Sequence, residues 1–445
     1  MSRDWNWATV DEIKAQNAHA ISMGPFGSDI KTDNFVAYGI PVIRGVNLSK
    51  RRFHEDGFVF ISEEKANELK SANAYPGDII FTHRGTLGQI GLIPSNSKYK
   101  RYVISQSQMK LTCDSAKVDP LFVFYYFRSP VGQRELLKHT STTGVPALSH
   151  PLTSLKSIRV PLPPIVEQRA IANVLDCMDA KIELNDKINA TLEAAAQAIF
   201  KHWFIDFEFP NGDEEPYKSS GGEMRPTELG EIPQGWGVSG VDSIADYING
   251  KAFTAHATQR GRPIIKIAEL KSGIKTTTKK YGGQADPSNI AYFDDILFSW
   301  SASLDLFRWW GEESVINQHI FKVIPKRHFT KLFIYYTLKS VMPHFQSIAS
   351  TKVTTMGHIK RHHLSDEKVV IPPKVIIKKF EETAGPFYYM IAPNSRENGI
   401  LSRLRDKILP QLLSGAIKAS TTQKKTIRSG ASAQDERYQS LKRII

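Results

Sequence analysis

Apolar residues recur at three- and four-residue steps along a segment in the middle of the chain. Between positions 167 and 203 they include Ile171, Leu175, Met178 and Ile182, and the segment contains neither proline nor glycine. This spacing predicts one long helix with a narrow apolar stripe, about 55 Å long at 1.5 Å per residue. A stripe this narrow predicts pairing with another helix rather than burial in a small domain.

A second stripe of the same kind lies between positions 380 and 412, so we expect the two helices to pair as an antiparallel coiled coil. Pro386 and Pro393 lie in the first half of the second helix. Because a proline inside a helix removes a backbone hydrogen bond, we expect a kink or a broken start there. Four asparagines lie within the stripes, where a buried amide would fix the register of the helices: Asn185, Asn189, Asn394 and Asn398.

The rest of the chain alternates short β-branched and aromatic runs with glycine-rich turns. Residues 41–44, 78–81 and 296–300 are typical of strands, whereas residues 121–128 and 332–339 are typical of short helices that pack aromatic faces on a sheet. Regular β-α-β units are not recognisable in this pattern, so we do not expect a Rossmann fold.

The two stripes belong to an internal repeat of about 209 residues. Pro163-Pro164 aligns with Pro372-Pro373, and Val103-Ile104-Ser105-Gln106 resembles Val315-Ile316-Asn317-Gln318. The repeat predicts an α+β fold with two similar mixed α/β domains, each followed by a long helix, in a pseudo-two-fold arrangement. The expected divisions are a first domain at 1–160, a helix at 161–205, an acidic linker at 206–234, a second domain at 235–370, a second helix at 371–417 and a flexible basic tail at 418–445.

The formal net charge of +13 suits a polyanionic partner such as nucleic acid. The charge is uneven, because residues 206–231 hold eight acids against two bases, whereas the chain from Ala416 onward holds seven bases against two acids. We expect this basic tail to add nonspecific affinity for phosphates. The chain shows no apolar run of membrane-spanning length and no signal peptide, and Cys113 and Cys177 match no metal or redox spacing, so we expect a cytoplasmic protein.

Motifs of catalysis are not recognisable in the sequence. Neither Pro-Pro pair follows an acid or amide, or precedes an aromatic residue, as an adenine methyltransferase requires, and a Gly-Lys-Ser/Thr phosphate loop is missing. His358 and His362 have the spacing of a helical zinc pair, with His363 beside them, but no glutamate follows His358. The intervening Lys360 and Arg361 favour a basic, DNA-facing segment. We therefore predict no catalytic residue, no cofactor and no metal.

Several sequence phrases, mostly in the helices, match one family. They are Pro161–Arg169, Asp179–Asn185, Asn189–Glu193, Ala196–Phe204, Leu229–Trp236 and Leu404–Gly415. With these motifs the chain, over about residues 5–417, resembles the specificity subunit of type I restriction-modification enzymes. It departs from the family at residues 374–377, which lack the Glu-Gln that follows the first Pro-Pro pair, so contacts at the start of the second helix are not carried over.

The resemblance implies a noncatalytic subunit with two target-recognition domains, each reading one half of a split DNA sequence. It further implies that the helices dock two methyltransferase subunits, and that restriction subunits with motor activity join through the complex. Two other interpretations stay open. They are a stand-alone DNA-modifying enzyme with an unrecognised active site, against which the missing motif argues, and a coiled-coil scaffold, against which the size of the paired domains argues.

Candidate DNA contacts are polar residues that follow or interrupt the strand-like runs at matching places in both repeats, because such side chains read base edges and phosphates. In the first domain they are Arg44, Asn47, His83, Arg84, Gln106, Ser107, Thr143 and His150. In the second domain they are Lys266, Trp300, Asn317, Gln318, His319, Lys352, His358, Lys360 and Arg361.

Overall fold

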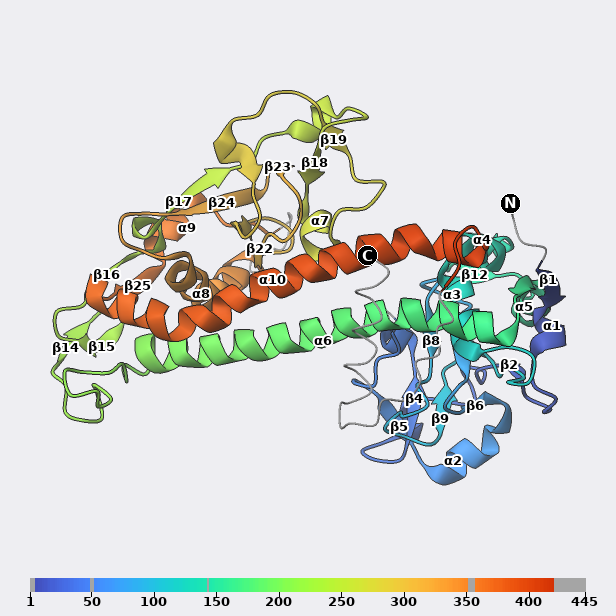
Figure 1. The fold of residues 1–445 in the computed structure, drawn as a ribbon. Helices are drawn as coiled ribbons and strands as arrows, with labels where there is room; N and C mark the ends of the chain where they lie inside the picture. The colour runs from blue at the N-terminus through green and yellow to red at the C-terminus, as the bar shows by residue number, and fades with distance from the viewer. Residues whose placement is uncertain (1–4, 49–51, 142–143, 351–356, 420–445) are drawn as a thin grey trace, which may run out of the picture. The chain divides into compact units, whose positions relative to one another are not determined.

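The computed structural model describes residues 5–48, 52–141, 144–350 and 357–419. They form two compact units, which can be followed by their colours in Figure 1. Unit 1 comprises the chain up to Ile182 together with the residues from Leu401 onward, and unit 2 comprises Glu183–Ile400. Thr143, Lys352 and the basic tail from residue 420 lie outside the described residues.

Unit 1 is built on two sheets of short strands. One has the order β2-β10-β7-β8 and the other the order β3-β5-β4-β9-β6, in which β4 and β9 run parallel. A separate pair, β1 with β13, joins the start of the chain to the segment that leads into the first long helix. The strands are β1 (Asn6–Thr9), β2 (Ile21–Met23), β3 (Phe35–Val36), β4 (Ile40–Ile43), β5 (Val59–Ile61), β6 (Asn73–Ala74), β7 (Ile79–Thr82), β8 (Ile90–Leu92), β9 (Tyr102–Ile104), β10 (Gln108–Leu111), β11 (Thr140–Ser141), β12 (Ala147–Leu148) and β13 (Arg159–Leu162).

Helix α3 covers the four-stranded sheet of unit 1 and confirms the predicted short helix. Asp119 caps it by accepting hydrogen bonds from two backbone amides, and Pro120 lies in its first turn, where proline costs no hydrogen bond. Phe127 of α3 meets Phe81 of β7 edge to face, with ring centroids 5.0 Å apart, inside the main core of the unit. The short helices are α1 (Val10–Ile13), α2 (Glu63–Glu68), α3 (Pro120–Arg128), α4 (Pro130–Leu137) and α5 (Pro151–Ser157).

Unit 2 repeats this topology. Its sheets have the orders β17-β24-β21-β22 and β19-β18-β23-β20, and β18 and β23 run parallel as β4 and β9 do. The strands are β16 (Gly237–Gly240), β17 (Ala245–Asn249), β18 (Arg262–Ile265), β19 (Lys280–Tyr281), β20 (Ile290–Ala291), β21 (Ile296–Ser299), β22 (Asp305–Arg308), β23 (Ser314–Ile316), β24 (Ile320–Pro325) and β25 (Lys368–Ile371). The helices are α7 (Ile267–Ser272), α8 (Lys331–Ser350), which is longer than predicted, and α9 (Arg361–Asp366).

The predicted acidic linker is a folded part of unit 2. It contains the hairpin of β14 (Met224–Thr227) and β15 (Gly230–Pro233). Phe207 and Phe209 are buried, and the ring of Phe209 stacks on Trp236 with centroids 5.0 Å apart. Apolar residues placed between the acids therefore anchor this segment, while most of its acidic residues are exposed.

Two helices of 40 residues each, α6 (Ile165–Phe204) and α10 (Lys374–Leu413), follow the two domains. Of the kink or broken start predicted for α10, the broken start is wrong, because Pro386 and Pro393 both lie inside an uninterrupted helix. Around these prolines Ala384, Tyr388 and Ile391 are buried in unit 2. Packing of this apolar face holds the helix together where the backbone alone would break.

Sections of α6 and α10 pack against each other inside each unit, as predicted (Figure 1). In unit 1, Met178 and Ile182 of α6 form a small core with Leu401 of α10. In unit 2 the amide of Asn185 donates to Asn398 Oδ1 at 2.9 Å, whereas farther along α6 Phe200 meets Phe380. Partner numbers fall as α6 numbers rise, so the pairing within unit 2 is antiparallel.

The four asparagines predicted within the apolar stripes form side-chain hydrogen bonds between α6 and α10. The amide of Asn394 donates to Asn189 Oδ1 at 2.9 Å, and the amide of Asn398 donates to Asp186 Oδ1 at 2.7 Å. Asn185 is completely buried. These amide contacts pair specific positions and so select one register. Among the described residues, no helix is long and apolar enough to cross a membrane.

Candidate nucleic-acid interface

Residues 105–107, here called turn A, join β9 to β10 in unit 1 and are held by neighbouring strand ends. The amide of Ser105 donates to the carbonyl of Ile43 at 2.9 Å, and the amide of His83 donates to the carbonyl of Ser107 at 3.0 Å. Turn A therefore lies between the ends of β4 and β7. Gly24 approaches so closely that an added Cβ would stand 1.9 Å from the Ser105 carbonyl oxygen, so only glycine fits there.

Turn A borders a cavity of about 390 Å³. Four of the predicted DNA contacts line it together: Arg44, Arg84, Gln106 and Ser107. Other polar lining residues were not predicted, because the pattern of a strand does not show which of its side chains border a cavity. They are Thr82, Thr86, Gln89, Ser105 and Gln108.

The lining of this cavity combines cationic and neutral polar groups with the apolar side chains of Ile30, Phe35 and Val42, and includes no carboxylate. Arg44 donates from Nη2 to the carbonyl of Gly57 at 2.8 Å, whereas its Nε is buried and has no hydrogen-bond partner in the described structure. Arg84 is exposed. A guanidinium offers a fork of donors that matches a phosphate or the O6 and N7 edge of guanine. The cavity is therefore suited to a ligand rich in hydrogen-bond acceptors.

Asn47 does not face the cavity, which corrects its prediction as a DNA contact. It is completely buried, and its Oδ1 accepts a hydrogen bond from the amide of Arg44 at 2.9 Å. Its Nδ2 donates to the carbonyls of His54 and Asp56, both at 3.0 Å. The hydrogen-bonding groups of the Asn47 side chain are therefore occupied in holding the backbone that carries Arg44.

His83 is also buried rather than presented to a ligand, again contrary to the prediction. A ring nitrogen lies 3.1 Å from the carbonyl oxygen of Gln106, so the side chain supports turn A from within. Burial lowers the pKa of His83, which keeps the ring neutral near neutral pH. His150 is exposed at the start of α5, where its φ is 47°, but it is not among the residues that line the cavity.

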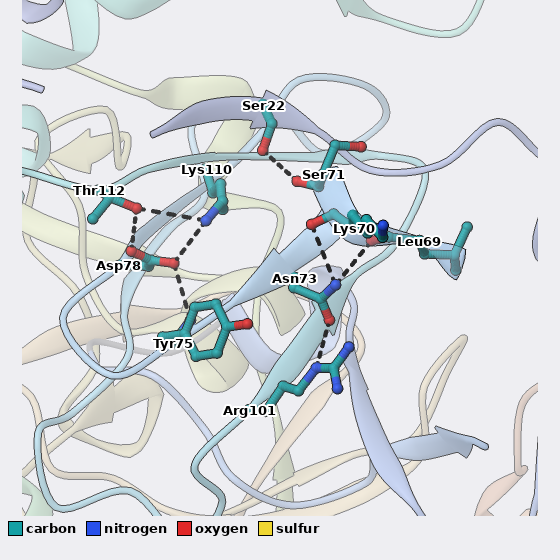
Figure 2. A network of polar contacts seen from close by, with 10 residues as sticks. All are labelled: Ser22, Leu69, Lys70, Ser71, Asn73, Tyr75, Asp78, Arg101, Lys110 and Thr112. Atoms are coloured by element: carbon teal, nitrogen blue, oxygen red, sulfur yellow. Dashed lines mark hydrogen bonds and ion pairs between the residues drawn. The ribbon is translucent and has the colours of Figure 1, made fainter. Parts of the chain in front are cut away.

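A buried ion pair lies in the sheet that carries turn A (Figure 2). Lys110 of β10 contacts Asp78, just before β7, at 3.1 Å, and both side chains are almost fully buried. Asp78 also accepts hydrogen bonds from Thr112 Oγ1 at 2.5 Å and from the amide of Tyr75 at 2.9 Å. The pair ties the two strands whose other ends carry turn A and His83, so it positions the site without lining it.

Residues 317–319 of unit 2, here called turn B, have the same backbone framework. The amide of Asn317 donates to the carbonyl of Ile265 at 3.0 Å, and the amide of Trp300 donates to the carbonyl of His319 at 3.1 Å. Gly250 approaches turn B as Gly24 approaches turn A, with an added Cβ 2.2 Å from the Asn317 carbonyl oxygen. Ser105, His83 and Gly24 thus have structural counterparts in Asn317, Trp300 and Gly250.

Four predicted DNA contacts gather at turn B. Trp300 packs on His319 with ring centroids 5.0 Å apart and donates from Nε1 to Asn249 Oδ1 at 2.9 Å. His319 has a φ of 77°, and its Nδ1 is buried without a hydrogen-bond partner in the described structure. Gln318 is exposed, while Asn317 Oδ1 accepts a hydrogen bond from Thr254 at 3.0 Å. Turn B therefore presents amides and rings, where turn A presents the amide of Gln106 near the guanidiniums of Arg44 and Arg84.

The remaining predictions in unit 2 are more scattered. Lys266 lies 3.7 Å from Glu269, whose carboxylate accepts a hydrogen bond from the Lys266 amide as Asn47 does for Arg44. His358 forms an isolated antiparallel β-bridge with Ser301, just after β21. Lys360 is exposed and precedes α9.

Arg361, the first residue of α9, lines a second polar hollow of about 320 Å³ together with Lys326, Asp242 and Asp246. Its guanidinium donates to the carbonyl of Tyr247 at 3.2 Å. The two carboxylates make this hollow less suited to an anion than the cavity at turn A. No group of three or more His, Cys, Asp or Glu residues in the described parts of the chain is placed to hold a metal ion.

Sequence reasoning missed the buried ion pairs. Unit 2 repeats the Asp78–Lys110 pair as Asp295–Lys322, with the two side chains 2.8 Å apart. A signal was present, because the offset that aligns Gln106 with Gln318 also aligns Lys110 with Lys322. A lysine inside a strand, kept in both copies, indicates a partnered charge rather than a surface residue.

Comparison with known families gives one match that covers most of the chain. The family model described as the type I restriction modification DNA specificity domain matches residues 27–194 and 233–379. The two matched segments contain turn A and turn B, respectively.

Individual relatives have low sequence identity to this chain, but the similarity extends over most of its length. The chain is 25% identical over 376 residues to the type I restriction enzyme MjaIX specificity subunit of Methanocaldococcus jannaschii, covering 80% of this chain and 81% of that protein. It is 24% identical to the HindI specificity subunit of Haemophilus influenzae, covering 77% of this chain and 86% of that protein. The crystal structure of the type I restriction-modification system S subunit from M. genitalium has a similar fold, with a TM-score of 0.54 at 15% identity, over 93% of this chain and 97% of that one.

Proposed function

Because this chain belongs to the type I restriction modification DNA specificity family, it is a noncatalytic specificity subunit, and we propose that its two units read the two halves of a bipartite double-stranded DNA target. The observation that carries the proposal is the duplicated framework of turns A and B. Two copies of one backbone framework, each carrying exposed glutamine at its tip, suit two separate half-sites better than one continuous site.

The chemistry of both turns supports direct reading of bases. Arg44, Arg84 and Gln106 at the cavity of unit 1 are the residue types that pair with guanine and adenine edges in the major groove. Asn317 and Gln318 offer amides in unit 2. The net charge of +13 adds nonspecific attraction to the phosphate backbone.

We further propose that α6 and α10 dock two methyltransferase subunits. Val166 and Val375 occupy equivalent positions of the repeat, one in each unit, and are 60% and 58% exposed near the starts of the two helices. Leu184 and Ile188 lie one turn apart on α6 and are also exposed. Duplicated apolar residues at equivalent positions are suited to two copies of one partner. Restriction subunits would join through these methyltransferase subunits, in the cytoplasm where the DNA lies.

The test is to co-express this chain with the modification subunit of its own system and map methylated adenines by methylation-sensitive sequencing. We expect a motif of two short specific parts with a fixed unspecified gap. The purified chain alone should transfer no methyl group from S-adenosylmethionine, and activity should appear on adding the modification subunit. A continuous motif, or turnover by the chain alone, would contradict the proposal.

A further inference from the structure

Phe26 is an apolar side chain held out in solvent beside the cavity of unit 1. It is 78% exposed, although burying such a ring is worth about 2 kcal/mol. It lies in the segment Gly24-Pro25-Phe26-Gly27, which the DNA-contact predictions above did not include. A single exposed apolar side chain is ordinary on a protein surface, so what singles out Phe26 is its place in the loop that meets turn A.

The loop that carries Phe26 is fixed rather than loose. The amide of Gly24 donates to the carbonyl of Gln108 at 2.8 Å. The amide of Asp29 donates to the carbonyl of Phe26 at 2.9 Å, and the Asp29 carboxylate accepts a hydrogen bond from the Phe26 amide at 3.2 Å. These bonds fix the backbone that carries the ring, which lowers the entropy lost when a ligand covers it.

The residue after Phe26 lies against turn A, which borders the cavity. A Cβ on Gly27 would stand 2.8 Å from Oε1 of Gln106, so the backbone next to Phe26 touches the exposed tip of turn A. Arg44 and Arg84 line the same cavity, and no carboxylate does. The ligand that covers Phe26 should therefore be anionic or rich in acceptors, and should carry an apolar group beside them.

Unit 2 has no equivalent of this ring. Gly250 takes the place of Gly24 against turn B, but the chain continues through Lys251 and Ala252 where unit 1 has Pro25 and Phe26. The next residue, Phe253, is only 7% exposed and packs on Tyr281. The exposed ring is thus a property of unit 1 and not of the shared framework.

We propose that Phe26 contacts the C5-methyl group of a thymine in the half-site read by unit 1. The inference rests on the proposed function and adds to it a base identity for one half of the target. In the major groove of a DNA duplex, thymine alone among the bases presents an apolar methyl group, and it lies beside the donors and acceptors that Gln106 and Arg84 are suited to read. Insertion of the ring between base pairs is the competing arrangement, which would require unstacking of the duplex.

The test uses the complete complex of this chain with its modification subunit and the duplex identified by methylation mapping. Each thymine outside the methylated position is replaced in turn by uracil, which lacks only the methyl group, and binding is measured for each duplex. We expect one or more thymines in a single half-site to show a loss of about fourfold, the value of one buried methyl group. Positions in the other half-site serve as the internal control.

Phe26→Ala and Phe26→Leu complete the test. The Phe26→Ala complex should bind thymine and uracil duplexes equally, while Phe26→Leu should keep part of the discrimination. Equal discrimination by the wild type and Phe26→Ala complexes overturns the proposal, and so does indifference of the wild type to every uracil. Fluorescence of 2-aminopurine that rises only with Phe26 present, without methyl discrimination, would assign insertion instead. Methylation of the unmodified duplex tests the proposed function separately from this contact.

Discussion

Turns A and B show one backbone framework carrying two different surfaces. In unit 1 the framework supports Arg44, Arg84 and Gln106, whereas in unit 2 it supports Trp300 packed on His319. Backbone hydrogen bonds at matching positions place both turns, and those bonds do not depend on the side chains. Chemical specificity can therefore change at the surface without altering the sheet beneath it.

The buried ion pairs differ in a way that the framework does not require. Lys110 contacts Asp78, and both side chains are nearly completely buried. In unit 2 Asp295 contacts Lys322 at 2.8 Å and a second cation, Lys331, at 3.6 Å, with more solvent around them. The carboxylate of unit 2 thus keeps a cation when one lysine is lost, whereas Asp78 has no second cation among the described residues.

The attachment of each domain to the long helices differs as well. In unit 1 the buried Asp179 of α6 binds Arg128 at 3.0 Å and Tyr125 at 3.1 Å, both from α3, and also pairs with Arg405 of α10. In unit 2 the corresponding bonds from α8, made by Tyr336 and Lys339, reach the partly exposed Glu193. One attachment depends on a buried charge cluster, while the other is surrounded by aromatic side chains.

The largest expected effect is the loss of stability when the lysine of a buried ion pair is replaced. Lys110→Met leaves the Asp78 carboxylate buried without its cation and should lower the free energy of unfolding of unit 1 by about 3–5 kcal/mol. The matched Lys322→Met should cost only about 1–2 kcal/mol, because Lys331 remains beside Asp295. Hydrogen exchange resolved by peptide would measure both. Equal losses in the two units would contradict the assigned difference.

Next in size is the attachment to the helices. Asp179→Ala should destabilise unit 1 by about 3 kcal/mol, because two guanidiniums lose a shared buried carboxylate. Glu193→Ala in unit 2 should cost about 1 kcal/mol, since that carboxylate is partly solvated. Denaturant titration of each variant, followed by proteolysis near α3 and α8, measures the ranking. A larger loss for Glu193→Ala would reverse the interpretation.

A smaller effect is expected on base discrimination, when polar side chains at turn A or turn B are removed. Arg84→Ala with Gln106→Ala should relax base discrimination in one half-site by about 1–3 kcal/mol for each well-formed pair lost, and leave the other half-site unchanged. Gln318→Ala should relax only the opposite half-site. Methylation rates of the complex on duplexes with single base changes give the readout, and the exposed Val131→Ala serves as a control. Relaxation of both half-sites by one variant would argue against independent reading.

The smallest expected effect is the dependence of the stability of unit 1 on pH. Burial lowers the pKa of His83 below its ordinary 6.5. As the pH falls, His83 is therefore protonated more readily in the unfolded chain than in folded unit 1. The cost to stability is absent well above pH 6.5 and grows as the pH falls below it, by at most about 1.4 kcal/mol per pH unit. Wild type should therefore lose stability in acid faster than His83→Gln. Parallel pH profiles of unfolding for the two proteins would exclude this contribution.

Much of the architecture could be predicted from periodicity. The stripe through Ile171 and Ile182 indicated α6, and the repeat indicated two similar domains, because alternation and helical spacing are local consequences of which face is buried. The helix break at Pro386 was mispredicted for the same reason, since a local rule takes no account of the packing around Ala384 and Tyr388.

The site was predicted only in part. Arg44, Arg84, Gln106 and Ser107, each predicted as a DNA contact, line one cavity, whereas Asn47 and His83 point inward. A polar residue after a strand has the same sequence signature whether its side chain caps backbone or meets a ligand. The distinction depends on which carbonyls lie within reach: that of His54 comes from the loop before β5, and that of Gln106 from turn A.

The amino-acid sequence by itself determined the duplication, the two long helices with asparagines in their apolar stripes, the basic charge and the family resemblance. Each of these depends only on the spacing of residues along the chain or on composition. Tertiary structure alone decided that Lys110 is buried against Asp78, that Phe26 is exposed while Phe253 is covered, and that distant strand ends form one cavity. The physical reason is that burial and partnership belong to the whole set of neighbours around a side chain. Sheet pairing brings those neighbours together from positions that the chain itself keeps far apart.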